Sequence, residues 1–437
     1  MSDFCKVPEK FQWFRDAKYG VFIHWGPYAR YERGEQVLFR EHLNQREYEE
    51  NARQWNPKNF DADAWADVFA RAGFQYACLT TRHHDGYCLW NTKTTDYNSM
   101  VQTAGRDLVR EYTEAVRKRG LRVGLYYSWC DWRQPAYYEG PGKNPEGFEK
   151  VKRMIWEQLD ELMTNYGKID YLFFDGTWPR YGDEIGTEEI VAHIRTLQPD
   201  ILINNRLGFR GNQEEIDKFG GLEDEGDFGT PEQNVFPQDR MWESCQTSTW
   251  RWWGYTKNER YKSSDEILKL LCESVSKGGN MILNVGPKPD GTLPEEFTER
   301  ALAVGKWLNT YGEAIYGTDG GDLTEFATCG YQTMKGKNLY LIFSIWNCSP
   351  VLRLPDMTSR AAEAVLMGRK ERLTVEQKGT TLYIGGLPED AGEPLFSVIK
   401  IQFAERPGTT SWGKERQWQG DPMRIAHWAR GEETGNF

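Results

Sequence analysis

The sequence lacks the segments that would anchor the chain in a membrane or build it around disulfides. Its 437 residues contain no run of about 18 apolar residues, and the stretch MSDFCKVPEKFQWF has no basic start followed by an apolar segment. The eight cysteines form no CxxC pair, and several fall within apolar runs, as reduced and buried thiols do. We therefore expect a cytoplasmic protein, or a secreted or periplasmic one if a signal peptide has been removed.

Positive charge is scarce relative to negative charge. The formal net charge of -11 argues against nucleic acid or an anionic membrane surface as the main partner. Aromatic residues, in contrast, make up 14% of the chain and include 18 tryptophans. Most of them are expected in the core, but ligand pockets are also rich in aromatic side chains, and sugar rings have flat apolar faces on which such side chains can stack. The composition is therefore compatible with a carbohydrate ligand.

Short apolar runs alternate with amphipathic segments from residue 20 to about residue 317, which is typical of βα units around a parallel sheet. A helix is predicted between Asp61 and Gly73, where the apolar residues share one face. The number of units favours a TIM-type (β/α) barrel, and no GxGxxG motif follows the first strand to indicate a doubly wound sheet. Strands are predicted at Gly20–His24, Tyr76–Thr81, Val123–Tyr127, Ile169–Phe174, Ile201–Asn205 and Met281–Val285.

The period of the apolar residues changes from 3.6 to 2 after about residue 320. We predict a (β/α) barrel over residues 1–320, a C-terminal antiparallel β-sandwich over residues 321–405 and an irregular tail over residues 406–437. The tail could wrap the body or reach a neighbouring subunit, which leaves a homo-oligomer open. The alternating apolar residues of the predicted sandwich are Leu373, Val375, Leu382, Ile384, Ile399, Ile401 and Phe403.

The active site of a barrel forms at the C-terminal ends of its strands, so the residues that end the apolar runs are candidates for function. Any one of them is more often a hydrogen-bonded structural residue than a catalyst, but together they describe a polar pocket with aromatic walls. The strongest signal is YLFFDG, because Asp175 follows a nearly apolar strand. Capping of the next helix is the alternative role, but that helix is predicted to begin only near Thr187. The candidates are His24, Trp25, His83, His84, Asp85, Tyr126, Tyr127, Trp129, Asp175, Asn204, Asn205, Arg206 and Asn284.

A metal site is an alternative use of His24, His83, His84 and Asp85. Adjacent strand residues point to opposite faces, so His83 and His84 are not expected to face one ion. The sequence has no HExxH motif and no histidines spaced at a helical turn. We therefore predict no metal and no cofactor.

Four segments carry longer motifs, and they resemble glycoside hydrolase family 29, the α-L-fucosidases. The resemblance covers about residues 10–320 and implies a retaining exo-glycoside hydrolase that releases α-L-fucose from fucosylated glycans by double displacement. The segments are GVFIHWGPY (20–28), WNPKNFDADAWADVFARAGFQYACLTTRHHDGYCLW (55–90), RDLVREYTEAVRKRGLRVGLYYSWCDW (106–132) and SKGGNMILNVGPKPDGTLP (276–294).

The resemblance implies roles for individual residues. Asp175 in FFDG matches the nucleophile, and Glu232 in DFGTPEQ matches the general acid and base. Two tryptophans that are common in the family are replaced by Phe173 and Gln36, which leaves open how tightly and how exclusively fucose is held. The residues that match fucose-binding positions are His24, Glu35, His83, His84 and Tyr127 for the hydroxyls, Arg206 as a pocket arginine, and Phe22 and Trp253 for the C5 methyl group.

Other acids lie close to Glu232 in the sequence, at Glu215, Glu223, Asp224 and Glu225. The run 223–225 is interpreted as a solvated acidic turn, whereas the proline before Glu232 stiffens its loop. Three alternatives to a fucosidase stay open. They are an exo-hydrolase for a related sugar such as α-L-galactose, a catalytically inactive fucose-binding protein and a metal hydrolase.

Overall fold

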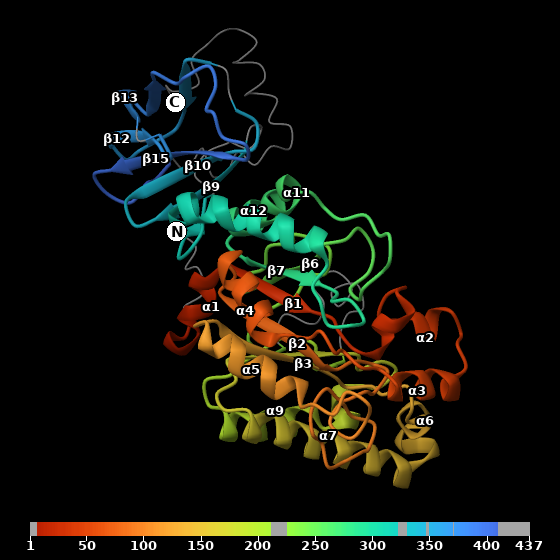
Figure 1. Cartoon of the computed structure of the whole chain (residues 1–437). Helices are drawn as coiled ribbons and strands as arrows, with labels where there is room; N and C mark the ends of the chain where they lie inside the picture. Colours follow the sequence, from red (N-terminus) through yellow and green to blue (C-terminus); the bar gives the residue numbers. More distant parts are fainter. Residues whose placement is uncertain (1–6, 211–224, 322–329, 347–348, 370, 410–437) are drawn as a thin grey trace. The chain divides into compact units, whose positions relative to one another are not determined.

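The computed structural model describes residues 7–210, 225–321, 330–346, 349–369 and 371–409 (Figure 1). The chain forms two compact units, one of Met1–Ser263 and Asn280–Gly305 and the other of Ser264–Gly279 and Lys306–Phe437. Most of the predicted tail lies outside the described residues. None of the helices among the described residues has the length and hydrophobicity of a membrane span.

An all-parallel sheet of seven strands forms the first unit, in the order β5-β4-β3-β2-β1-β7-β6. All six predicted strands are present, and nearly all of their residues are buried because the sheet is covered on both faces. The additional strand β6 has the polar sequence ESCQT, which a search for apolar runs does not detect. The strands are β1 (Tyr19–Ile23), β2 (Tyr76–Arg82), β3 (Arg122–Ser128), β4 (Tyr171–Asp175), β5 (Leu202–Ile203), β6 (Glu243–Thr247) and β7 (Asn280–Val285).

Residues 226–233 fill the gap between the edge strands β5 and β6. Phe228 forms a parallel bridge with Asn204, and Glu232 forms one with Cys245. The amide of Asp227 donates to Ile203 O, and the amide of Gln233 donates to Cys245 O. This segment takes the place of an eighth strand and closes the sheet, which confirms the predicted TIM-type barrel.

Helices follow the strands as the βα pattern predicts. Helix α4 begins after Asp61, whose carboxylate accepts the amide of Ala64, and its buried face includes Trp65 and Phe69. Helix α5 lies against β2 and β3, beside α4 (Figure 1). The helices of this unit are α1 (Gln12–Ala17), α2 (Val37–Arg40), α3 (Gln45–Arg53), α4 (Ala62–Arg71), α5 (Leu108–Lys118), α6 (Pro135–Lys143), α7 (Pro145–Asn165), α8 (Gly182–Ile185) and α9 (Thr187–Leu197), with 3-10 turns at Glu9–Phe11 and Pro27–Tyr31.

A buried carboxylate lies inside the barrel near the N-terminal ends of the strands. Glu243, the first residue of β6, accepts hydrogen bonds from the hydroxyls of Tyr76 and Tyr171. Burial raises the pKa of Glu243 to about 7, although both hydrogen bonds act in the opposite direction. Phe14 of α1 packs against Tyr76 and Phe228 and covers the same end of the barrel.

The second unit contains an antiparallel sheet of eight strands in the order β11-β14-β13-β12-β15-β10-β9-β8. The apolar residues predicted to alternate there pack into one core, with Val375 at its edge, which confirms the antiparallel β fold. The strands are β8 (Asp319–Gly320), β9 (Gly330–Lys335), β10 (Asn338–Phe343), β11 (Val351–Leu354), β12 (Ala361–Leu366), β13 (Glu371–Lys378), β14 (Thr381–Gly385) and β15 (Ser397–Phe403). Helix α11 (Ser264–Ser276) and the 3-10 turn Gly312–Ala314 belong to this unit, and α12 (Glu295–Tyr311) runs from the first unit into the second.

Candidate active site

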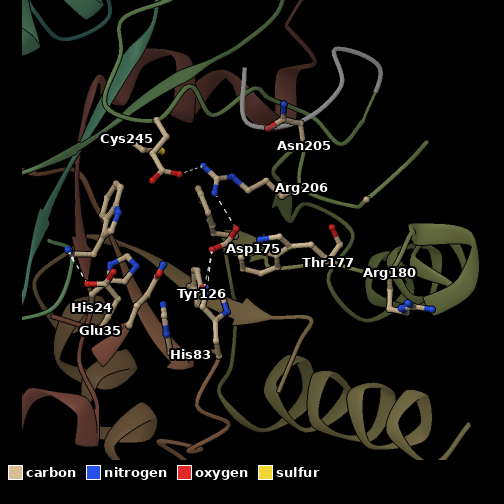
Figure 2. Close-up of a pocket in the computed structure, with 18 of the residues that line it drawn as sticks. His24, Glu35, His83, Tyr126, Asp175, Thr177, Arg180, Asn205, Arg206 and Cys245 are labelled. Atoms are coloured by element: carbon tan, nitrogen blue, oxygen red, sulfur yellow. Dashed lines mark hydrogen bonds and ion pairs between the residues drawn. The ribbon is translucent and has the colours of Figure 1, made fainter. Parts of the chain in front are cut away.

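A cavity of about 530 Å³ opens at the C-terminal ends of the barrel strands, within the range of about 300 to 1,000 Å³ that is usual for ligand pockets (Figure 2). The strands bring together residues that are far apart in the sequence. The predicted site residues that line this cavity are Phe22, His24, Glu35, His83, His84, Asp175, Arg206, Glu232 and Trp253.

Asp175 is the last residue of β4, and its carboxylate is held on both oxygens. Arg206 Nη1 donates to Oδ1 over 3.0 Å, and the hydroxyl of Tyr126 donates to Oδ2 over 3.1 Å (Figure 2). Burial would raise the pKa of Asp175, but the charge of Arg206 and the hydrogen bonds from Arg206 and Tyr126 outweigh this effect. These groups hold the pKa of Asp175 below its usual value, so the group is ionised and available as a nucleophile.

Gly176 follows this aspartate in a left-handed conformation, with φ of 72°. A Cβ atom at this position would lie 2.3 Å from the ring of Trp178 and 2.9 Å from that of His84. The FFDG motif therefore needs glycine both for the backbone turn and for the close approach of two pocket side chains.

Arg206 connects the two carboxylates of the site. Its Nη2 donates to Glu232 Oε2 over 3.1 Å while Nη1 holds Asp175. The Glu232 side chain is 44% exposed, compared with 24% for Asp175. One carboxylate is thus fixed at the end of a strand, and the other faces both the cavity and solvent.

His24 is held as a neutral ring with a defined proton position. Asn284 Nδ2 donates to Trp253 O over 2.7 Å, so Asn284 Oδ1 is turned toward His24 Nδ1 at 2.6 Å. Nδ1 therefore carries the proton, and Nε2 is left as an acceptor. Burial lowers the pKa of His24 to about 3, which keeps the ring uncharged.

His84 is oriented in the same way. The Ser128 hydroxyl donates to Cys130 O over 2.9 Å and thus accepts from His84 Nδ1 at 2.7 Å. Burial lowers the pKa of His84 to about 4. Its Nε2 lies 3.8 Å from Asp175 Oδ2, so this nitrogen can accept a hydrogen bond from a ligand hydroxyl that lies close to the carboxylate.

An apolar wall lies beside these polar groups. The ring of Trp253 lies 5.1 Å from that of His24 and 6.1 Å from that of Phe22, between ring centroids. Glu35 fixes the backbone here, because its Oε2 accepts the amides of Trp253 and Gly254. Burial raises the pKa of Glu35, although these two bonds counteract the effect. Phe173 and Gln36, where the resemblance expects tryptophans, also line the cavity.

The placement of Tyr127 in the fucose pocket is wrong. Its hydroxyl donates to Gln158 over 2.8 Å, and the guanidinium of Arg82 lies 4.3 Å from its ring, away from the cavity. Successive strand residues point to opposite faces, and Tyr126 faces the cavity instead. The register of β3 and β4 decides which tyrosine faces the cavity, because Ser128 pairs with Asp175 and Tyr126 lies two residues before Ser128 on the same face.

The expectation that His83 and His84 point to opposite faces assumed that both lie on a strand, and this assumption is wrong. Strand β2 ends at Arg82, so both histidines lie beyond it and both line the cavity, with ring centroids 4.0 Å apart. Burial lowers the pKa of His83 well below its usual value. Across the described ranges, no group of three His, Cys, Asp or Glu residues is placed to hold a metal ion.

The interpretation of residue 225 as part of a solvated turn is incorrect. Glu225 is 2% exposed, lines the cavity and accepts the amides of Leu207 and Phe209. Glu215, Glu223 and Asp224 lie outside the described residues. Trp178 and Cys245 also line the cavity, although neither was predicted to. Trp178 lies in the loop after β4, where a barrel is expected to place site residues, whereas Cys245 lies on the polar strand β6.

Several strand-end candidates support the site without lining it. Asn284 orients His24, and Trp129 Nε1 donates to Arg206 O over 3.0 Å. The candidates that do not line the cavity are Trp25, Asp85, Tyr127, Trp129, Asn204 and Asn284, whereas Tyr126 and Asn205 do.

Known proteins are similar to this chain in sequence and in architecture. The alpha-L-fucosidase family model matches residues 5–313. Tissue alpha-L-fucosidase of Bos taurus is 32% identical over 420 residues, which cover 89% of this chain and 88% of the relative. Tissue alpha-L-fucosidase of Homo sapiens is also 32% identical, over 427 residues covering 89% of this chain and 88% of the relative.

Solved structures of alpha-L-fucosidases are similar to this chain over most of its length. Alpha-L-fucosidase isoenzyme 1 from Paenibacillus thiaminolyticus has a TM-score of 0.82 at 34% identity, covering 91% of this chain and 99% of that one. A family 29 alpha-L-fucosidase from Bacteroides thetaiotaomicron, trapped as a covalent intermediate with 2-fluoro-fucosyl fluoride, has a TM-score of 0.82 at 29% identity, covering 91% of this chain and 97% of that one. With a family match over most of its length and these relatives, the chain belongs to the alpha-L-fucosidase family, glycoside hydrolase family 29.

Proposed function

We propose that this protein is a retaining α-L-fucosidase that removes fucose from fucosylated glycans. The observation that carries the proposal is the bridge formed by Arg206 between Asp175 and Glu232. Two carboxylates that share one guanidinium are close together, as retaining cleavage requires at a separation of about 5 to 5.5 Å. The relative trapped as a covalent intermediate supports the same double displacement for this chain.

In the first step, Asp175 attacks the anomeric carbon of fucose and forms a glycosyl ester, while Glu232 gives a proton to the departing glycosidic oxygen. In the second step, Glu232 takes a proton from water, which attacks the same carbon and releases Asp175. The lowered pKa of Asp175 supports its role, because an ionised carboxylate is the nucleophile. The exposure of Glu232 supports its own role, since that group must meet both leaving group and water.

Fucose recognition follows from the polar and apolar sides of the cavity. The acceptor nitrogens of His24 and His84 are available to sugar hydroxyls, because their other nitrogens are occupied by Asn284 and Ser128. The wall of Phe22 and Trp253 suits the C5 methyl group. An α-L-galactoside would place an extra hydroxyl against this wall without a partner, which makes it the poorer substrate.

The test is hydrolysis of 4-nitrophenyl α-L-fucoside followed by NMR from the first seconds, with 4-nitrophenyl α-L-galactoside as a matched substrate. We expect α-L-fucose to appear first and to mutarotate afterwards, and the fucoside to have the larger kcat/KM. First release of the β anomer would contradict retention, and a preference for the galactoside would contradict the substrate. Binding of fucose without turnover would indicate a binding protein, and loss of activity with a chelator would indicate a metal hydrolase.

A further inference from the structure

A second cavity, of about 450 Å³, lies in the barrel unit and has no part in the cleavage step proposed above. Its lining contains three arginines and only one carboxylate, although the whole chain has a net charge of -11. The lining of this cavity is therefore positively charged, whereas the protein as a whole is negatively charged. The lining residues are Arg33, Val37, Phe39, Arg40, Glu41, His42, Arg251 and Trp252.

Two of the three arginines have no carboxylate partner within the described part of the chain. Arg33 is neutralised by Glu41, at 2.7 Å between Nε and Oε1. The guanidinium of Arg40 lies 5.3 Å from the Trp252 ring, and that of Arg251 lies 5.0 Å from it. Both guanidinium groups thus lie close to the ring of Trp252, and neither has a carboxylate partner among the described residues, so both are available to an external anion.

This cavity adjoins the candidate active site. Arg40 Nε donates over 3.0 Å to the side-chain oxygen of Gln36, which lines the first cavity. Trp252 lines the second cavity and the next residue, Trp253, lines the first.

Aromatic contacts make a second connection. The ring of Phe39, which is 61% exposed, stacks on Trp132 at 5.6 Å, and Trp132 lies 5.4 Å from His84. A glycan that leaves the fucose pocket past Gln36 meets the arginines of the second cavity.

We propose that the second cavity is an aglycone subsite for an acidic glycan, a sugar that carries a carboxylate or a sulfate ester, and this rests on the proposed fucosidase function. Guanidinium groups bind planar and tetrahedral oxyanions through paired hydrogen bonds, which suits Arg40 and Arg251. The exposed ring of Phe39 supplies an apolar face for the sugar ring that bears the anion. The enzyme thus distinguishes fucosylated glycans by the charge of the sugars beyond fucose.

The test measures competitive inhibition of 4-nitrophenyl α-L-fucoside hydrolysis by fucosyl disaccharides. The disaccharides join fucose to galactose through 1→2, 1→3 and 1→6 linkages, each in a neutral, a carboxylated and a sulfated form wherever that linkage leaves the position free. For at least one linkage we expect an acidic form to bind about fivefold more tightly than its neutral counterpart, as solvent-exposed charge pairs allow. The two acidic forms distinguish a carboxylate from a sulfate, and the preference should decrease as salt is added.

The double variant Arg40→Gln/Arg251→Gln should bring the ratio of acidic to neutral inhibition constants close to one. Arg110→Gln is the matched control, because this exposed arginine also lies over an aromatic ring, that of Tyr166 at 5.0 Å, but lines neither cavity. It should keep the wild-type ratio. Equal inhibition by neutral and acidic forms through all linkages, or a preference that survives in the double variant, would overturn the subsite. Absence of nitrophenyl fucoside hydrolysis would instead overturn the proposed fucosidase function.

Discussion

The hydroxyl of Tyr126 donates a hydrogen bond to Oδ2 of Asp175 over 3.1 Å. Asp175 is therefore held by a neutral donor on one oxygen and by a charged donor on the other. This tyrosine sits on the strand next to the nucleophile, in parallel register with β4. It is a positioning residue for the nucleophile that the family resemblance did not indicate.

We expect Tyr126→Phe to lower kcat/KM on 4-nitrophenyl α-L-fucoside by about tenfold to a hundredfold, because a hydrogen bond to a charged group is worth about 1.5 to 3 kcal/mol. The matched control is Tyr127→Phe, which removes a hydroxyl that contacts Gln158 outside the cavity. This control should lower the melting temperature and leave kcat/KM of the folded protein close to wild type. A loss of kcat/KM in Tyr127→Phe but not in Tyr126→Phe would indicate that Tyr127, and not Tyr126, belongs to the pocket.

Asp175→Asn should lower kcat by about 10⁴-fold or more, as loss of a catalytic nucleophile does in other enzymes. The amide cannot form the glycosyl ester, while the fold should persist because the residue lies at the cavity and is 24% exposed. Circular dichroism checks the fold, and mass spectrometry of the wild type with 2-fluoro-fucosyl fluoride should show a fucosyl adduct on the peptide containing Asp175. A variant with near-wild-type turnover would place the nucleophile elsewhere.

Glu232→Ala should lose most activity on a natural fucoside and retain more on a nitrophenyl fucoside, because a phenolate leaves with little proton assistance. Azide should rescue the variant and give a fucosyl azide with the anomeric configuration of the substrate. Glu225→Ala is the comparison, since Glu225 is buried and accepts two backbone amides. It should lose stability and show no azide product, and an azide product from it alone would identify Glu225 as the acid.

Glu243 should make stability depend on pH. Its folded-state pKa of about 7 exceeds the ordinary value of 4.5, so its contribution to stability is fully present below pH 4.5 and is lost as the pH rises through 7. Glu243→Gln stays neutral, so the stability of the variant relative to wild type should increase between about pH 5 and about pH 8, by no more than about 3 kcal/mol. Urea unfolding at several pH values measures this difference, and a constant difference across the range would contradict a neutral Glu243.

In the second unit, Phe403→Ala should lower stability by about 3 to 5 kcal/mol, because the side chain is 1% exposed within the core of the sheet. Leu395→Ala should cost less, since Leu395 is only partly buried. Neither residue lines a cavity described above, so specific activity of the folded protein should not change. Differential scanning calorimetry and activity per folded molecule test this, and a large loss of specific activity would assign the sheet a direct role in turnover.

Local sequence patterns were enough to predict the architecture. Apolar runs mark buried strands, and the alternation around Ile399 and Phe403 marks a sheet with one buried face, because burial of apolar area and side-chain period are local properties. The same reasoning correctly predicted that Asp175 lies at the end of β4. It failed at β6, whose polar residues are buried in the barrel by neighbours that are distant in the sequence.

The barrel, the antiparallel sheet and the family could be predicted from the sequence alone, since they depend on periodicity and on contiguous motifs. The folded structure was needed to show that Tyr126, and not Tyr127, contacts Asp175, and that Glu225 is buried against Leu207 and Phe209. The physical reason is that the direction of a side chain at a strand end is fixed by its register with the neighbouring strands. The burial of a loop carboxylate likewise depends on which distant backbone amides the fold brings to it.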